Sequence, residues 1–199
     1  MPELIQSDAP TRFEIPQLMD WSILPASVTA AAWTDPEIRA LLLSDPTTLL
    51  QERIPRWPAD KTFCVVADSA ETKFFVLPAR KQSLDGRSRD SIVETLTRET
   101  GDDQTLEDWL PVDVIADALL DRAFRAELIH DPARVLHDRG YKPPNRKIIV
   151  LENSEFTYHL VLPEHPSRQQ DLDVSSLEAN LRERYGTNTT KCCASGTCD

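Results

Sequence analysis

The side chains best suited to covalent chemistry lie together in residues 187–199, T-N-T-T-K-C-C-A-S-G-T-C-D. The one aliphatic side chain of this tail is Ala194, so the tail cannot contribute to a hydrophobic core. Small, polar and nucleophilic residues at this density favour a segment that another protein modifies, with the rest of the chain as its carrier. The thiols and hydroxyl groups concerned belong to Cys192, Cys193, Cys198, Thr187, Thr189, Thr190, Ser195 and Thr197.

Two modifications fit these side chains, because a thiol with a pKa of about 8.5 is partly ionised at neutral pH and its thiolate is a strong nucleophile. In the first, a Ser or Thr is dehydrated and a cysteine adds to the new alkene, which gives a thioether ring. In the second, a Cys, Ser or Thr attacks the preceding backbone carbonyl and water is lost, which gives an azoline, or an azole if an enzyme then oxidises the azoline by two electrons. The spacing slightly favours thioethers, since Thr189, Thr190 and Ser195 each stand the same distance before a cysteine.

Other uses of the cysteines have less support in the sequence. A closed zinc site usually has four ligands, whereas the tail holds three cysteines and no histidine. A disulfide between Cys193 and Cys198 after export is a further alternative. Cys64 lies in an apolar run and is interpreted as a small buried side chain. No nucleophile–base arrangement is visible, so no catalytic residue, metal site or cofactor is predicted, and the chain is not expected to be an enzyme.

The composition of the chain argues against two classes of binding partner. The chain has 199 residues, a formal net charge of −11 and a pI of about 4.8. An acidic balance argues against binding nucleic acid or an anionic membrane surface. Neither a secretory signal nor an apolar run long enough to span a membrane is visible, so synthesis in the cytoplasm is expected. Cysteines are kept reduced there, which makes a ready-made disulfide framework a poor explanation of the tail.

The carrier is predicted to be an α+β protein with helices followed by strands. Thr34 is expected to be the N-cap of one helix, with Pro36 in its first turn and Glu37 completing a capping box. Asp45 followed by Pro46 predicts the start of a second helix. Two Val- and Phe-rich runs, 62–67 and 73–77, flank a polar turn and predict a β-hairpin.

A second stretch repeats this pattern. Asp131-Pro132 corresponds to Asp45-Pro46, and strand-like runs at 147–152 and 158–162 follow. A long helical pattern runs from about Thr105 to Ile129 before it. The prediction is a duplicated helix–helix–β-hairpin unit, followed by a short helix and a disordered C-terminal tail. The expected divisions are an N-terminal arm 1–26, a first block 27–78, a linker 79–91, a second block 92–166, a C-terminal helical segment 167–186 and the tail 187–199.

The two blocks resemble nitrile-hydratase-alpha-like leader peptides, which belong to precursors of ribosomally made, post-translationally modified peptides. The Asp-Pro pairs after a leucine-rich helix and the closing Val-Leu-Pro runs, Val76-Leu77-Pro78 and Val161-Leu162-Pro163, carry the resemblance. In that family a short helix and a glycine precede a Cys-, Ser- and Thr-rich core. The helix around Leu177 and Leu181, Gly186 and the tail fit that layout.

This resemblance implies a precursor whose leader recruits a modifying enzyme, either a lanthionine synthetase or a cyclodehydratase, before a leader protease or ABC exporter removes it. Enzyme recognition is then assigned to Leu177, Leu181, Val161 and Leu162, and cleavage to Gly186. The chain departs from the family by its second block and by the reduction of the usual double glycine to Tyr185-Gly186. It also lacks the C-x-x-C-S-C metal claw of the namesake enzyme, so nitrile hydration is not implied. The alternative function is an adaptor or metal-binding protein with a Cys-rich tail.

Overall fold

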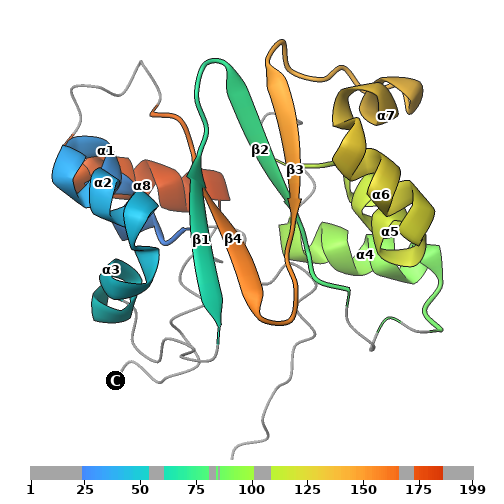
Figure 1. The fold of residues 1–199 in the computed structure, drawn as a ribbon, viewed down its shortest axis with the longest axis horizontal. Helices are drawn as coiled ribbons and strands as arrows, with labels where there is room; N and C mark the ends of the chain where they lie inside the picture. Colours follow the sequence, from blue (N-terminus) through green and yellow to red (C-terminus); the bar gives the residue numbers. More distant parts are fainter. Residues whose placement is uncertain are drawn as a thin grey trace, which may run out of the picture.

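The computed structural model describes residues 24–53, 61–80, 84, 86–100, 109–165 and 173–185. Residues 1–23 and the whole tail 187–199 lie outside these ranges. The described residues form eight helices and four strands (Figure 1). They are α1 (Ala26–Thr34), α2 (Pro36–Ser44), α3 (Pro46–Arg53), β1 (Thr62–Ala67), β2 (Thr72–Leu77), α4 (Arg89–Thr100), α5 (Val112–Leu120), α6 (Arg122–His130), α7 (Pro132–Asp138), β3 (Lys147–Glu152), β4 (Thr157–Leu162) and α8 (Val174–Tyr185). The predicted α+β class is confirmed.

Aspartates start the helices that pack on the strands. The carboxylate of Asp35 accepts N–H groups from Glu37 at 2.8 Å and Ile38 at 3.2 Å, so Asp35 and not Thr34 is the N-cap of α2. The predicted cap at Thr34 is wrong because this residue ends α1, where its hydroxyl donates to the carbonyl of Ala30 at 3.1 Å. Asp45 caps α3 as predicted, since Thr48 donates to both of its carboxylate oxygens.

The predicted long helix through residues 105–129 is two helices. Asp121 separates α5 from α6, because its backbone is extended, with φ −114° and ψ 114°, and its carboxylate accepts N–H groups from Ala123 and Phe124. An aspartate that caps its own successors is stable outside a helix and stops the preceding one. Gly140 ends the following helix α7 with φ +81°, a conformation that glycine adopts without strain.

The strands form no hairpins, so that part of the prediction is wrong. β1 pairs in parallel with β4, with Thr62 opposite Thr157, and β2 pairs in parallel with β3, with Thr72 opposite Lys147. The chain does reverse between β1 and β2, through the hydrogen bond from Ser69 N to Thr72 O at 2.9 Å. The backbone groups beyond this turn form hydrogen bonds with other strands. Asp68 N, for example, donates to Leu162 O of β4 at 2.9 Å. The two strands therefore diverge and exchange partners with the second half of the chain.

The chain is a six-element unit present twice. Elements α1–α2–α3–β1–β2–α4 recur as α5–α6–α7–β3–β4–α8. Helices α1 and α5 have nine residues each, and α4 and α8 have twelve. Pro25 and Pro111 precede α1 and α5 with nearly equal backbone angles. The structural repeat is thus longer than the predicted helix–helix–hairpin unit by one helix at each end, and α4, which the predicted bounds placed largely in the second block, ends the first unit.

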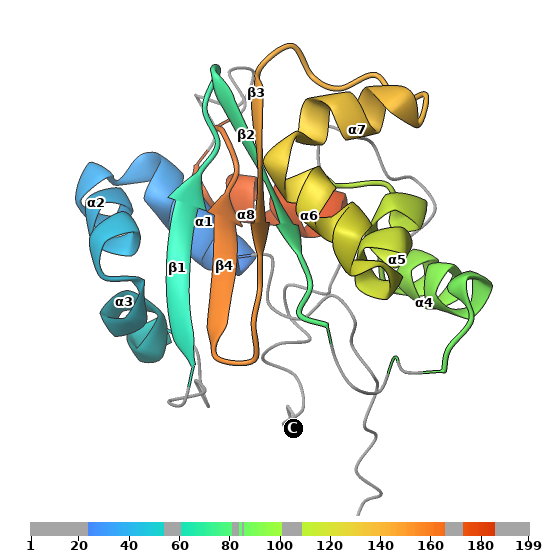
Figure 2. The ribbon, with the colours of Figure 1, turned by 45° about the vertical axis from the view of Figure 1, so that its right-hand side comes forward.

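The two units are interleaved rather than placed side by side. Helix α8 packs on α1, and α4 packs on α5, so each unit covers the other's first helix. The group α1, α2, α3 and α8 lies on one side of the strands and α4–α7 on the other (Figure 1), and the strands run alongside one another between them (Figure 2). Helix α4 starts at Arg89, and Leu84 is buried, so the predicted linker 79–91 contributes to this packing.

Each hydrophobic cluster draws on both units. One contains Phe75 of β2 and Val150 of β3 with apolar residues of α4–α7. The other contains Phe63 of β1 and Leu160 of β4 with apolar residues of α1–α3. Because each cluster needs one strand from each unit, neither half of the chain encloses a core from its own residues alone.

Candidate functional site

The predicted chemistry lies beyond the described part of the chain. Gly186, the predicted cleavage point, and the tail residues predicted to be modified are all outside the described residues. The latter are Thr189, Thr190, Cys192, Cys193, Ser195, Thr197 and Cys198. The structure does describe α8, the helix that ends one residue before Gly186, and this helix connects the folded body to the tail.

Leu177 and Leu181, two residues predicted for enzyme recognition, face the interior. Their exposed fractions are 0% and 5%, and they form a small cluster with Ala26 and Ala30 of α1. One turn of helix separates the two leucines, which places them on the same face of α8. A partner could contact these side chains only after α8 leaves α1.

The start of α8 is fixed by Asp173. Its carboxylate accepts the N–H of Ser176 at 2.8 Å, and its carbonyl accepts the N–H of Leu177 at 3.0 Å. The backbone hydrogen bond from Ser176 is the largest of the causes that hold the pKa of Asp173 below its ordinary value. Helix α8 is therefore capped by its own sequence and does not need α1 for its first turn.

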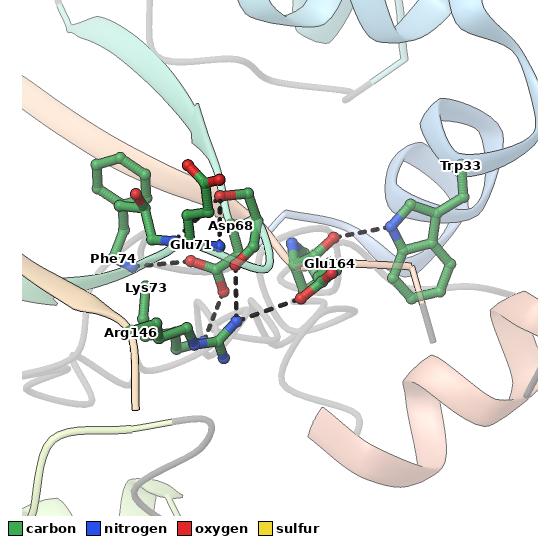
Figure 3. Close-up of polar contacts among 10 residues, drawn as sticks. Trp33, Asp68, Glu71, Lys73, Phe74, Arg146 and Glu164 are labelled. Carbon is green, nitrogen blue, oxygen red and sulfur yellow. Dashed lines mark hydrogen bonds and ion pairs between the residues drawn. The ribbon is translucent and has the colours of Figure 1, made fainter. Parts of the chain in front are cut away.

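Trp33 of α1 connects the helix pair with the chain that leaves β4. Its indole Nε1 donates to the carbonyl of Pro163 at 2.8 Å, the dashed line that starts from Trp33 in Figure 3. Its ring centroid lies 4.9 Å from that of His165. Trp33 is half-buried and packs against both the α1–α8 cluster and the β1–β4 cluster. It is the side chain that joins these two groups.

Val161 and Leu162, the other predicted recognition residues, belong to β4. Leu162 is fully buried in the β1–β4 cluster, and Val161 is half-buried and paired with Val66. The carbonyl of Leu162 accepts the N–H of Asp68. The structure therefore keeps these two residues apart from Leu177 and Leu181, with Trp33 between the two groups.

A buried ion pair lies at the turn between β1 and β2. Lys73 Nζ is 2.6 Å from Asp68 Oδ2, and the two side chains are 6% and 2% exposed. The other carboxylate oxygen, Oδ1, accepts the N–H of Phe74 at 2.8 Å (Figure 3). A pair so poorly solvated must be fully hydrogen-bonded to be tolerated, since removing one partner leaves an uncompensated buried charge.

Arg146 connects this turn with the end of β4. Its guanidinium donates to the carbonyl of Ser69 at 2.9 Å and to the carboxylate of Glu164 at 3.2 Å (Figure 3). Glu164 follows Pro163, the acceptor of the Trp33 indole. A polar connection therefore runs from the β1–β2 turn through Arg146 to the chain segment beside Trp33.

The corresponding turn of the second unit has the same backbone and no ion pair. Asn153 replaces Asp68, and its Oδ1 accepts the N–H of His159 at 2.7 Å, as Asp68 accepts that of Phe74. Tyr158 replaces Lys73 and stacks on Phe63 with ring centroids 5.6 Å apart. Burial lowers the pKa of the His159 imidazole.

A charged network fixes α4 on the other side of the molecule. Asp117 of α5 lies 2.6 Å from Arg89 of α4 and 2.6 Å from Arg139. Burial would raise the pKa of Asp117, but the hydrogen bonds from the two arginines outweigh it and lower the pKa below its ordinary value. Tyr141 donates to Asp113 at 2.5 Å, and burial together with this hydrogen bond raises its pKa to about 12.

Arg125 of α6 lies across the ends of β2 and β3. Its Nε is 2.8 Å from Glu152, and its Nη2 donates to Pro78 O at 3.1 Å. The remaining atom, Nη1, is buried and is the one buried side-chain polar atom without a partner among the described residues. The described residues contain no group of histidine, cysteine or acidic side chains placed to hold a metal ion.

Sequence reasoning missed three features of this arrangement. They are the Asp68–Lys73 pair, the Arg89–Asp117 pair and the indole hydrogen bond of Trp33. Each joins residues through side chains, and the last two join residues far apart in the chain. The duplication held the signal that could have found the first, because Asp68 and Lys73 stand where the second unit has Asn153 and Tyr158.

Known proteins resemble this chain in structure rather than in sequence. The sequence matches no protein-family model and no curated protein. Among solved structures, an Fe-type nitrile hydratase variant from Comamonas testosteroni Ni1 aligns over 81% of this chain and 69% of its own, with 23% identity and a TM-score of 0.47. A thiocyanate hydrolase variant aligns over 82% and 73%, with 19% identity and a TM-score of 0.49. A thiocyanate hydrolase with partially modified cobalt centres aligns over 81% and 71%, with 20% identity and a TM-score of 0.48.

The aligned structures include nitrile hydratase, the enzyme after which the leader family of the sequence resemblance is named. The prediction that the chain is not an enzyme is not borne out, because the structures found are of enzymes, nitrile hydratase and thiocyanate hydrolase. At identities below 25% and TM-scores below 0.5 the likeness concerns fold alone and assigns no reaction. In the described part of the chain, no helix is long and apolar enough to cross a membrane.

Proposed function

We propose that the chain is the precursor of a modified peptide, in which the folded body formed by the described residues presents the tail 187–199 to a modifying enzyme. The observation that carries this proposal is where the duplication ends. Every element of the first unit has its counterpart by Tyr185, the last residue of α8. The Cys-, Ser- and Thr-rich tail follows as an addition with no equivalent after α4, where the chain continues as G-D-D-Q-T-L-E-D-W.

The chemistry proposed for the tail is formation of thioether, azoline or azole rings from its Cys, Ser and Thr residues. The proposed partners are a lanthionine synthetase or a cyclodehydratase, followed by a leader protease or ABC exporter that cleaves near Gly186. Covalent attachment of the tail to a body that the enzyme binds raises the effective concentration of each tail residue at the active site. This explains why a short substrate segment accompanies a body of this size.

The test is coexpression of the full chain with a lanthionine synthetase or with a cyclodehydratase, followed by mass spectrometry of the C-terminal fragment. We expect the mass to fall by one water for each Ser or Thr dehydrated and for each azoline formed, with no further change when a thioether closes and a further loss of two hydrogens when an azoline is oxidised to an azole. We expect these losses to map to residues 187–199. Changing Cys192, Cys193 and Cys198 to alanine together should abolish thioether rings and every ring formed from cysteine, and should leave only the reactions of the Ser and Thr residues. An unchanged mass, or losses that map to the folded body, would contradict the proposal.

A further inference from the structure

Helices α4 and α8 occupy equivalent places and differ in how they are held. Each ends its unit, has twelve residues and packs on the first helix of the other unit. Each buries two apolar side chains one turn apart, Ile92 and Leu96 in α4 and Leu177 and Leu181 in α8. Because α4 and α8 have the same length and equivalent positions in their units, the contacts that hold them can be compared within one molecule.

Helix α4 is held by charge as well as by apolar contact. Arg89 in its first turn is 2.6 Å from Asp117 and 4.0 Å from Asp113, both on α5. Ile92 and Leu96 belong to the larger hydrophobic cluster, which also contains residues of α5, α6, α7, β2 and β3. Moving α4 away from α5 would break the ion pairs and open that cluster.

Helix α8 has none of these restraints among its described side chains. Val174 stands at the position of Arg89 and is 42% exposed, and α1 has Ser27 and Ala31 where α5 has Asp113 and Asp117. The ion pair of α8 joins Arg182 to Glu178 within the helix itself. Its buried leucines contact a small cluster completed by Ala26 and Ala30.

We propose that α8 is a releasable recognition helix. It leaves α1 as a unit, and the face formed by Leu177 and Leu181 then binds an apolar groove on the modifying enzyme. This inference rests on the proposed function, since the enzyme is the partner that must approach the tail. An amphipathic helix that presents apolar anchors one turn apart is suited to binding in a groove of this kind.

Release and binding are coupled because of the length of α8. An isolated helix of this length is marginal in water, so the released segment keeps its helix only when a partner covers its apolar face. Its N-cap at Asp173 leaves with it, so the first turn needs no contact with α1. A helix of twelve residues is about 18 Å long, and its release would free the tail to move at least that far from the body.

Hydrogen exchange of the full chain in the absence of any partner tests the release. We expect the amides of α8 to exchange at least about tenfold faster than those of α4, after correction for intrinsic rates, because α8 opens locally. Equal protection of α4 and α8 would overturn the proposal. The result does not depend on the tail being a substrate.

A transplant of the α4 ion pairs tests the recognition role. The variant Ser27→Asp/Ala31→Asp/Val174→Arg gives α1 and α8 the charges that α5 and α4 carry, and its control is Ser27→Asp/Ala31→Asp, which lacks the arginine. We expect the triple variant to slow exchange in α8 and to lower modification of the tail by the coexpressed enzyme at least about tenfold relative to the control. The reverse change, Arg89→Val, should speed exchange in α4 and leave modification unchanged.

The outcomes separate this inference from the proposed function. If the triple variant slows exchange in α8 but its tail is modified as fast as that of the control, recognition through released α8 is wrong while the precursor function stands. If the natural chain is not modified at all, the precursor function fails and recognition through α8 fails with it, whatever the exchange rates.

Discussion

The two units of this chain share one backbone plan and stabilise it differently. The β1–β2 turn of the first unit buries Asp68 with Lys73, whereas the second unit has Asn153 with Tyr158 at the same place. In both turns a side-chain oxygen accepts the same backbone N–H, so the hydrogen bond and not the charge defines the turn. The duplication thus separates what the fold requires from what one copy has added to it.

The interfaces of the first helices, α1 with α8 and α5 with α4, also share a backbone arrangement and differ in their charges. There the second unit contributes the charges, with Asp113 and Asp117 on α5, and the first unit has none at those positions of α1. Among the described side chains, the interface next to the tail has no ion pair between its two helices. The two equivalent surfaces are therefore held by different contacts, and the one without ion pairs lies next to the segment proposed to react.

The largest effect is expected from breaking the charge pair of the first turn. Lys73→Met leaves the Asp68 carboxylate buried without a counter-charge, which should lower the free energy of unfolding by about 3–5 kcal/mol. Urea denaturation of the full chain measures this loss. The control Asp68→Asn/Lys73→Met keeps the acceptor for the Phe74 N–H, as Asn153 does in the other turn, and should recover most of it. An equal loss in both variants would show that the charge pair is not the cause.

The next effect compares the buried leucines of the two equivalent helices. Leu96→Ala opens a cavity in the larger cluster and should cost about 2–5 kcal/mol of global stability. Leu181→Ala should leave the main unfolding transition nearly unchanged, because α8 opens before the body unfolds, and should instead raise exchange in α8. Equal shifts of the main transition in the two variants would contradict the difference between the helices.

A smaller and equal effect is expected at the two helix caps. Asp35→Ala and Asp121→Ala each remove a carboxylate that accepts two backbone N–H groups, and each should cost about 1 kcal/mol. Substitution by asparagine at either site retains an acceptor and should cost less. Thermal or urea unfolding measures both. The similar backbone angles of Asp35 and Asp121 indicate equivalent caps. A loss of stability several times larger at one site than at the other would contradict that equivalence.

The smallest effect is the pH dependence that Asp117 brings to α4. Its pKa is lower in the folded chain than in the unfolded chain, so its contribution is present above the ordinary carboxyl pKa of about 3.9 and is lost as the pH falls through the lowered value. The stability difference between the natural chain and Asp117→Asn should stay below about 1 kcal/mol at neutral pH and shrink on acidification. A difference that grows at low pH would have the wrong sign for this ion pair.

Local features of this fold were readable from the residues. Asp45 and Asp131, each followed by proline, were identified as helix starts because a cap acts on residues two or three positions away. The strand runs 62–67 and 73–77 were identified because Val- and Phe-rich composition on both sides of a polar turn is a local signal. The cap at Asp35 was missed because the neighbouring Thr34 has the same capping chemistry, and sequence alone does not decide which of the two leaves the helix.

By itself, then, the sequence determined the duplication, the α+β class and the concentration of thiols and hydroxyl groups in one tail, because all three follow from residue identity and short-range spacing. Only the tertiary structure decided that β1 and β2 part to pair with β4 and β3, and that Leu177 and Leu181 face α1. Those choices depend on which long-range packing buries the most apolar surface, and residues far apart in the chain contribute to it jointly. The same long-range packing brings Arg89 of α4 against Asp117 of α5, a pairing that their separation in the chain did not reveal.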